Sequence, residues 1–109
     1  MDEKNATAEF WKAANENNEQ AARNELIHIS RETINAQDGD GYNMLITAVQ
    51  NENPCAVRAL LSCGKCDLDL RENLCGMTAQ EFAEDYPENS PIRRAFCATA
   101  KKDIRGQHV

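Results

Sequence analysis

The chain has 109 residues, 41% of them hydrophobic but only 6% aromatic, which fits one domain with a core of aliphatic and alanine side chains. Its net charge of −6 argues against non-specific nucleic-acid binding, because phosphates must be met by clustered Lys and Arg. No apolar stretch approaches the ~20 residues of a membrane-spanning helix, so we expect no membrane contact.

The first third of the chain predicts a pair of helices. Apolar residues recur with helical period over Glu9–Glu16 and again over Gln20–Ile29, and the polar run Asn15–Asn18 separates the two. A stretch rich in turn-forming residues follows, Thr33–Tyr42. Its Asp-Gly-Asp-Gly sequence predicts a hairpin-like loop.

The middle of the chain predicts a second helix pair with clear boundaries. Apolar side chains share one helical face over 45–49 and again over 57–61. Between these runs, Asn53 is a typical N-cap residue, with Pro54 at the first helical position. Gly64 suits the left-handed position after a helix and predicts where the second helix ends.

The last third repeats this order with weaker signals. A second turn-rich stretch, Asp67–Met77, leads into a helix predicted over Thr78–Asp85. Ser90 is the predicted N-cap of a final helix from Ile92 to about Lys102.

The chain is similar to itself at an offset of 35 residues. Gly41 lies 35 residues before Gly76, and Ala48 lies 35 residues before Ala83. Such an offset predicts stacked repeats, each of which needs its neighbours to bury its apolar face. We expect a single domain over residues 1–109, with repeats at about 8–35, 36–69 and 70–102 and a basic C-terminal tail at 101–109.

Two segments of the middle unit resemble the ankyrin repeat. The run Asp38-Gly-Asp-Gly-Tyr-Asn-Met-Leu-Ile-Thr-Ala48 is similar to that family's Asp-x-x-Gly-x-Thr-Pro-Leu-His-x-Ala pattern. The run Val57-Arg-Ala-Leu-Leu-Ser-Cys-Gly64 is similar to its Val-x-x-Leu-Leu-x-x-Gly stretch. The resemblance implies an all-α, ankyrin-like solenoid of three helix-turn-helix repeats joined by hairpin-like loops, and a monomer.

The terminal units depart further from that pattern. Asn17 stands where the family prefers Gly, and Ala79 and Gln80 replace its Pro-Leu. Atypical terminal repeats are expected of the caps that close a stack.

In ankyrin-like stacks, the loop tips and the outer faces of the first helices form a concave strip that binds partner proteins. Carried over residue by residue, the resemblance assigns partner binding to Trp11, Asn15, Gln37, Asp38, Asp40, Tyr42, Asn43, Ile46, Thr47, Gln50, Asn73, Leu74, Met77 and Glu81. Exposed Tyr42, Ile46 and Met77 would supply affinity, and Asp38 and Asp40 selectivity. The alternative is that Ile46 and Met77 only pack the hairpin against the helix.

Among the five cysteines, Cys63-Gly-Lys-Cys66 has the spacing of metal knuckles and redox pairs. Together with Cys75 and Cys97 it would offer four thiolates to zinc, so a zinc- or redox-linked thiol sensor is an alternative function. Against this, the chain has no second Cys-x-x-Cys, and the resemblance places a small buried residue at Cys66. We therefore expect structural thiols and no metal or cofactor.

The remaining motifs do not predict an enzyme. The sequence has no Gly-rich phosphate loop with a Lys, and neither His28 nor His108 has a nucleophile at a catalytic spacing. We expect a non-catalytic module that binds another protein, as an adaptor or effector. Because residues 36–90 hold ten acidic and three basic side chains, the partner would present a basic surface. An acidic immunity or inhibitor protein that masks a basic enzyme site is an alternative.

The compartment is predicted from the cysteines and the first residues. Residues 1–7 carry acids where a secretion signal needs a basic start and an apolar stretch. An odd number of cysteines then indicates reduced thiols rather than a disulfide framework. We expect a cytoplasmic protein, or one delivered into a host cytosol if it is an effector.

Overall fold

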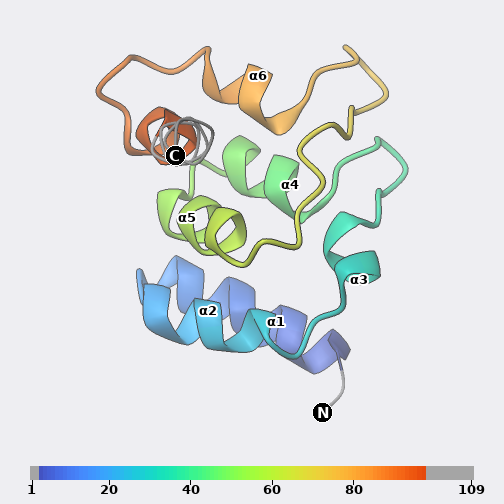
Figure 1. The fold of residues 1–109 in the computed structure, drawn as a ribbon, viewed down its shortest axis with the longest axis vertical. Helices are drawn as coiled ribbons and strands as arrows, with labels where there is room; N and C mark the ends of the chain where they lie inside the picture. Colours follow the sequence, from blue (N-terminus) through green and yellow to red (C-terminus); the bar gives the residue numbers. More distant parts are fainter. Residues whose placement is uncertain (1–2, 98–109) are drawn as a thin grey trace, which may run out of the picture.

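The structure is a computed structural model that describes residues 3–97, a part of the chain in which every regular element is a helix (Figure 1). Two helix pairs come first, with a short helix α3 between them, then a sixth short helix and a seventh over 91–97. The bounds are α1 Glu3–Asn15, α2 Glu19–Leu26, α3 Arg31–Asn35, α4 Met44–Gln50, α5 Pro54–Ser62 and α6 Ala79–Ala83. The prediction of an all-helical chain is thus confirmed for the described residues.

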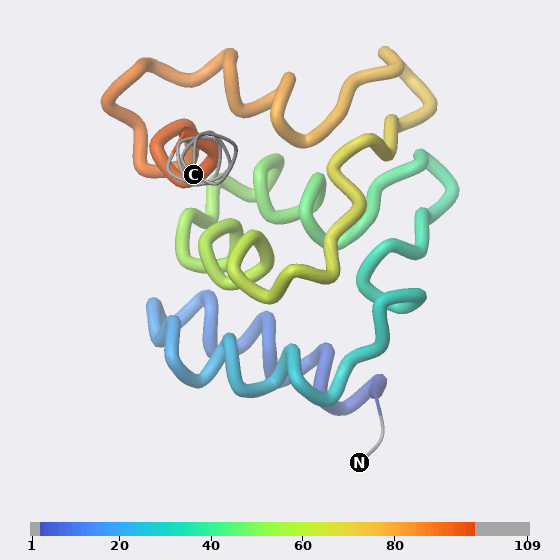
Figure 2. The backbone as a smooth tube through the Cα atoms, viewed as in Figure 1, coloured from blue at the N-terminus to red at the C-terminus, as the bar shows by residue number. Residues whose placement is uncertain are grey.

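The helix pairs are stacked along the long axis of the molecule (Figures 1 and 2). The pair α1 and α2 lies at one end, α4 and α5 lie in the middle, and α6 with the 91–97 helix lies at the other end. Both α1 and α2 contact α5, and α4 contacts α6. The two long loops, 36–43 and 69–78, project at the same side of the stack.

The turn inside the first helix pair has the same structure as the turn inside the second. Asn17 and Glu52, 35 residues apart, both have positive φ, at 59° and 55°. The next residues, Asn18 and Asn53, are the N-caps of α2 and α5, and each side chain accepts from the backbone N–H three residues on. Their own N–H groups donate to the alanine carbonyl five residues back, at 2.9 and 3.1 Å. The offset seen in the sequence is therefore also an offset in backbone structure.

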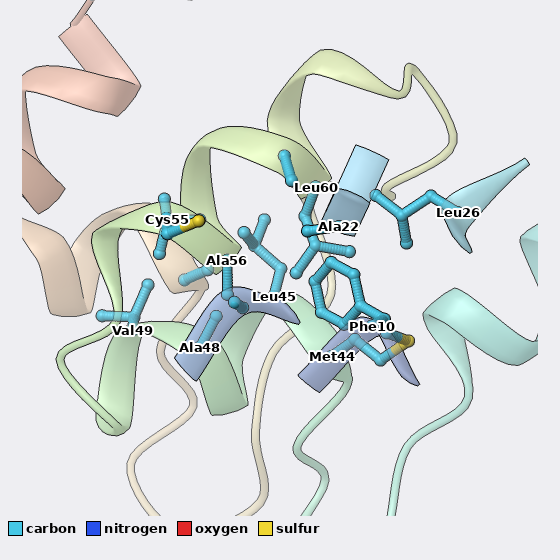
Figure 3. Close-up of a cluster of buried hydrophobic side chains, with 14 of the residues drawn as sticks. Phe10, Ala22, Leu26, Met44, Leu45, Ala48, Val49, Cys55, Ala56 and Leu60 are labelled. Carbon is cyan, nitrogen blue, oxygen red and sulfur yellow. The ribbon is translucent and has the colours of Figure 1, made fainter. Parts of the chain in front are cut away.

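One apolar cluster runs through the stacked helices from α1 to the 91–97 helix. Phe10 and Leu45, which are 35 residues apart, are at most 1% exposed, and Leu60 joins them from α5 (Figure 3). Burying a side chain of this size stabilises the fold by about 1.5–3 kcal/mol. Small residues bring the helix backbones close together: Ala6, Ala22, Ala48, Ala56 and Ala59 are fully buried. An aliphatic and alanine core is what the composition predicted.

The predicted bounds of four segments are wrong. Helix α1 begins at Glu3 rather than Glu9, and α2 ends at Leu26, which leaves Ile27 72% exposed. The stretch predicted to be a loop from Thr33 overlaps α3, because Ser30 caps a helical turn by accepting from Thr33 N. Helix α6 is only five residues long. The predicted helix beyond residue 97 and the basic tail at 101–109 lie outside the described residues.

None of the helices within residues 3–97 is long and apolar enough to cross a membrane.

Candidate functional site

The two long loops lie side by side and are joined by hydrogen bonds. Asn73 donates its backbone N–H to Asp40 O at 2.8 Å and its side-chain amide to Gly39 O at 3.2 Å. Gln37 Nε2 donates to Gly41 O in its own loop and to Arg71 O in the next, both at 2.8 Å. Three of these hydrogen bonds join the two loops and one lies within the first loop, so the loop edge is preorganised for binding.

Each loop is closed internally by one acidic side chain. Asp38 Oδ1 accepts from the N–H groups of Asp40 and Tyr42, both at 2.9 Å. Glu72 accepts from the backbone N–H groups of Leu74, Cys75 and Met77. In both loops the acidic residue also donates its own N–H across the turn at 3.0 Å, to Tyr42 O and Met77 O respectively. The two loops are therefore variants of one turn.

Glu72 is an ionised group inside the second loop. Its side chain is only 3% exposed. Burial opposes its charge, but the surrounding N–H groups outweigh this and lower the pKa of its carboxyl group. The sequence analysis did not identify this residue, although its place between two predicted repeats matches that of Asp38.

A groove of about 300 Å³ opens between the first loop and the helices α1 and α4. Its walls come from two helix pairs and the loop between them: Trp11, Ala36, Gln37, Asp38, Tyr42, Asn43, Met44 and Thr47. Trp11 and Tyr42 are half-buried against the core, so each presents an aromatic surface that is already fixed in place. The lining combines apolar anchors with a polar rim, which is the composition of a recognition site.

A second groove, of about 260 Å³, lies between the end of α4 and the segment around α6. It is lined by Val49, Gln50, Phe82, Asp85 and Tyr86. The Tyr86 hydroxyl donates to Val49 O at 2.9 Å, which ties the segment after α6 to the end of α4. Phe82 and Tyr86 were missed by the sequence analysis. Phe82 lies 35 residues after Thr47, so the repeat offset was the signal that could have found it.

Two residues predicted to contact a partner are buried instead. Ile46 is 1% exposed and Asn43 is 2% exposed. Helix α4 contacts α3, α5 and α6, so five of its seven residues are buried and Ile46 is part of the core. Asn43 is the N-cap of α4, with Oδ1 accepting from Ile46 N at 2.9 Å. Neither side chain is available to a partner.

Five further predicted residues are exposed in part but hold the fold together. Gln37, Asp38 and Asn73 make the loop hydrogen bonds described above. Glu81 forms a capping box with Thr78 and accepts from the Arg71 guanidinium at 3.0 Å. Asn15 accepts from Asn53 Nδ2 at 3.0 Å. Their side chains are therefore held at the surface rather than free to adapt to a partner.

The other predicted residues are exposed or half-exposed at or near the loop edge. They are Trp11, Asp40, Tyr42, Thr47, Gln50, Leu74 and Met77. Leu74 is the most open of the apolar ones, with 73% of its surface exposed. The structure thus brings Trp11, Tyr42 and Thr47 together in the first groove, and it places Gln50 in the second.

The four candidate zinc ligands are not gathered at one place. Cys63 and Cys66 lie together after α5, whereas Cys75 is exposed in the second loop and Cys97 is exposed on the last described helix. Within residues 3–97, no three His, Cys, Asp or Glu side chains are arranged to hold a metal ion.

Comparison with known proteins gives no relative for this chain. No protein-family model matches it, and neither does any curated protein or solved structure.

Proposed function

We propose that the chain is a non-catalytic interaction module that binds a partner protein through the first groove and the adjoining loop edge. In this proposal α1 and α2, α4 and α5, and α6 and the 91–97 helix are three units of an ankyrin-like stack. The observation that carries it is the convergence of Trp11 from α1, Tyr42 from the first loop and Thr47 from α4 on one groove of about 300 Å³. Aromatic side chains in a preformed groove are typical binding hot spots.

The rigidity of the loop edge supports the same proposal. The hydrogen bonds of Gln37 and Asn73 join the two loops, and the acids at 38 and 72 close each of them. A partner would therefore meet a surface that needs little ordering on binding, which lowers the entropic cost of association.

Acidic side chains indicate the charge of the partner. Asp38, Asp40, Asp67 and Asp69 are all exposed in the loop segments. A partner with a basic surface would be attracted to this edge, and the attraction would weaken with salt. An inhibitor that covers a basic enzyme site would use the same edge in the same way.

The proposal is tested by changing the groove without changing the fold. Thr47→Arg places a long cation across the groove, and Tyr42→Ala removes one aromatic anchor. Asn24→Arg is the matched control, because Asn24 is exposed on α2 and lines neither groove. Circular dichroism first establishes that all three variants fold.

Partner capture from the native lysate is then followed by titration with the purified partner. We expect Thr47→Arg to weaken binding at least tenfold, or about 1.4 kcal/mol, and Asn24→Arg to leave the Kd within twofold. Equal affinity for all three proteins would rule out the groove as the binding site.

A further inference from the structure

Cys63 and Cys66 form a thiol pair at the carboxyl end of α5. Gly64, with φ of +74°, turns the chain sharply after the helix. Cys66 therefore lies back beside Cys63. Both Sγ atoms lie within hydrogen-bond distance of Leu60 O, at 3.0 Å for Cys63 and 3.4 Å for Cys66. The Cys66 thiol also lies close enough to the Cys63 sulfur to lower the pKa of Cys63. The two sulfurs are therefore close enough to react with one another.

The surroundings of the pair favour a thiolate on Cys63. The hydrogen bond from Cys66, together with the backbone N–H and the charge of Lys65, outweighs burial and lowers the pKa of the Cys63 thiol to about 6. The Lys65 N–H lies 3.4 Å from the Cys63 sulfur. The hydrogen bond to Cys63 and burial raise the pKa of Cys66, so the two thiols have different roles.

The charged groups from the neighbouring elements are cations. Arg23 of α2 lines the same groove as Cys63, and the Arg31 guanidinium of α3 lies 3.5 Å from Gly64 O. The Lys65 ammonium donates to Leu26 O and Ile29 O, both at 2.9 Å, which holds this positive charge at the end of α2. No carboxylate lines the groove that contains Cys63.

Cys63 is half-buried and faces a groove. It lines a groove of about 330 Å³ between α2 and α5, with Leu26, Ile27 and Ala59 as apolar walls and Arg23 and Lys65 at its polar side. This volume is at the lower end of small-ligand sites. The groove shares no lining residue with the two grooves beside α4.

We propose that Cys63 and Cys66 are a redox-active dithiol that is oxidised by low-molecular-weight disulfides entering the α2–α5 groove. The Cys63 thiolate attacks one sulfur of the small disulfide, which forms a mixed disulfide and releases one small thiolate. Cys66 then loses its proton to solvent and attacks the Cys63 sulfur, which releases the second small thiolate. The products are one Cys63–Cys66 disulfide and two small thiols, so the two electrons lost by the pair reduce the small disulfide.

The test uses the full chain with Cys75→Ser and Cys97→Ser, since both of those thiols are exposed. Oxidised glutathione is added across a pH series, and intact mass and peptide mapping follow the thiols. We expect a Cys63–Cys66 disulfide, seen as the loss of two hydrogens. In a Cys66→Ser variant, whose hydroxyl keeps a donor to Cys63, the reaction should stop at one glutathione on Cys63.

The pH profile separates an activated thiol from an ordinary one. With a pKa of about 6, Cys63 is half ionised at pH 6. An unperturbed cysteine with pKa of about 8.5 is then only about 0.3% ionised, so Cys63 gains about 150-fold in thiolate. A thiolate of lower pKa is a weaker nucleophile, which lowers its rate constant about 15-fold. Cys63 in the folded chain should therefore react about tenfold faster than the same thiol in denaturant. Cys66→Ala should move the midpoint of the rate upward and lose this advantage.

Two outcomes would overturn the proposal. One is that both thiols stay reduced under conditions that oxidise a free cysteine peptide. The other is that the Cys66→Ser chain reacts with a midpoint near pH 8.5, or no faster than Cys66→Ala. Alkylation of the wild-type chain at pH 6 tests the activation of Cys63 without any substitution. Cys63 should be labelled about tenfold faster than Cys75, and equal labelling would contradict its activation.

Discussion

The turn between α1 and α2 and the connector that leaves α2 show how differently two parts of one repeat behave. The turn recurs 35 residues later with the same positive φ and the same asparagine N-cap. The connector does not recur. The residues that end α2 and α5, Ile27 and Cys63, both have right-handed backbone angles. Gly64 then has positive φ and the chain brings two thiols together, whereas no residue between Ile27 and α3 has positive φ. The turn that depends on a few local hydrogen bonds is repeated in the next unit, but the connector is not. Only the connector after α5 brings two cysteines together.

The largest expected effect comes from the paired glycines of the two loops. Gly41 and Gly76 both have positive φ, at 84° and 68°. A Cβ on Gly41 would lie 2.8 Å from the backbone nitrogen of Asn73, but a Cβ on Gly76 would meet nothing within 4 Å. Gly41→Ala should therefore cost about 2–4 kcal/mol, and Gly76→Ala about 1 kcal/mol from backbone strain. Urea unfolding of both variants measures the difference, and equal losses would show that the loops are not in contact.

Replacing Lys65 tests whether the connector after α5 stabilises the contact with the preceding unit. Its ammonium binds two carbonyl oxygens of the preceding unit, Leu26 O and Ile29 O, each at 2.9 Å. Lys65→Met keeps the apolar stem but removes both hydrogen bonds, and we expect a loss of about 1–3 kcal/mol in the free energy of unfolding. Lys12→Met is the control, because Lys12 is exposed, and should change stability by less than about 0.5 kcal/mol. Similar values for both would mean that Lys65 does not link the units.

Features set by neighbouring residues were predicted from the sequence, and those set by distant contacts were not. Asn53 and Pro54 start α5 as predicted, because an N-cap is a contact within one turn. Ile46 was assigned to the partner-binding strip from the ankyrin resemblance, but the contacts of α4 with α3, α5 and α6 bury it. The hydrogen bonds from Asn73 to the first loop span more than thirty residues and leave no local pattern.

Some signals were present in the sequence but were assigned another meaning. Thr78 and Glu81 have the Thr-x-x-Glu spacing of a capping box, which is what they form, although Glu81 was predicted to bind a partner. Ser30 precedes Arg-Glu-Thr and caps α3, within a stretch that its turn-forming residues marked as extended. Trp11, Tyr42 and Thr47 were assigned to a partner-binding strip from the ankyrin resemblance, and they lie together in the first groove.

The two asparagine caps test whether the repeated turns are also equal in energy. Replacing Asn18 or Asn53 with alanine removes one hydrogen bond to a free N–H at the start of a helix, so each should cost about 1 kcal/mol. Asn53→Ala should cost slightly more, because Asn53 also donates to Asn15 at 3.0 Å. Asn18→Asp keeps the cap and should stay within a few tenths of a kcal/mol of the wild type. Thermal unfolding measures all three, and a neutral Asn18→Ala would break the equivalence of the two turns.

The smallest effect concerns a position where the repeats differ in charge. Arg23, Arg58 and Arg93 follow one another at 35-residue intervals. Glu19 binds the first two, at 2.5 and 2.7 Å, but the residue 35 positions after Glu19 is Pro54, and Arg93 donates to the carbonyls of Glu84 and Tyr86 instead. Within residues 3–97, Glu19 is thus the only carboxylate that bridges these three arginines, and its ion pair with Arg58 joins α2 to α5.

Among these three arginine positions, we therefore expect a carboxylate-dependent loss of stability in acid only at the interface of α2 with α5. The hydrogen bond from Arg58, followed by that from Arg23, outweighs burial and lowers the pKa of Glu19 in the folded chain. The stabilisation is therefore complete above the unfolded pKa of about 4.3 and is lost as the pH falls through the lower folded value. Glu19→Gln should remove less than about 1 kcal/mol at pH 7, and the gap to wild type should close as the pH falls through the lowered pKa of Glu19. Urea unfolding over a pH series measures it. A gap that is independent of pH would show that Glu19 acts through packing rather than through its charge.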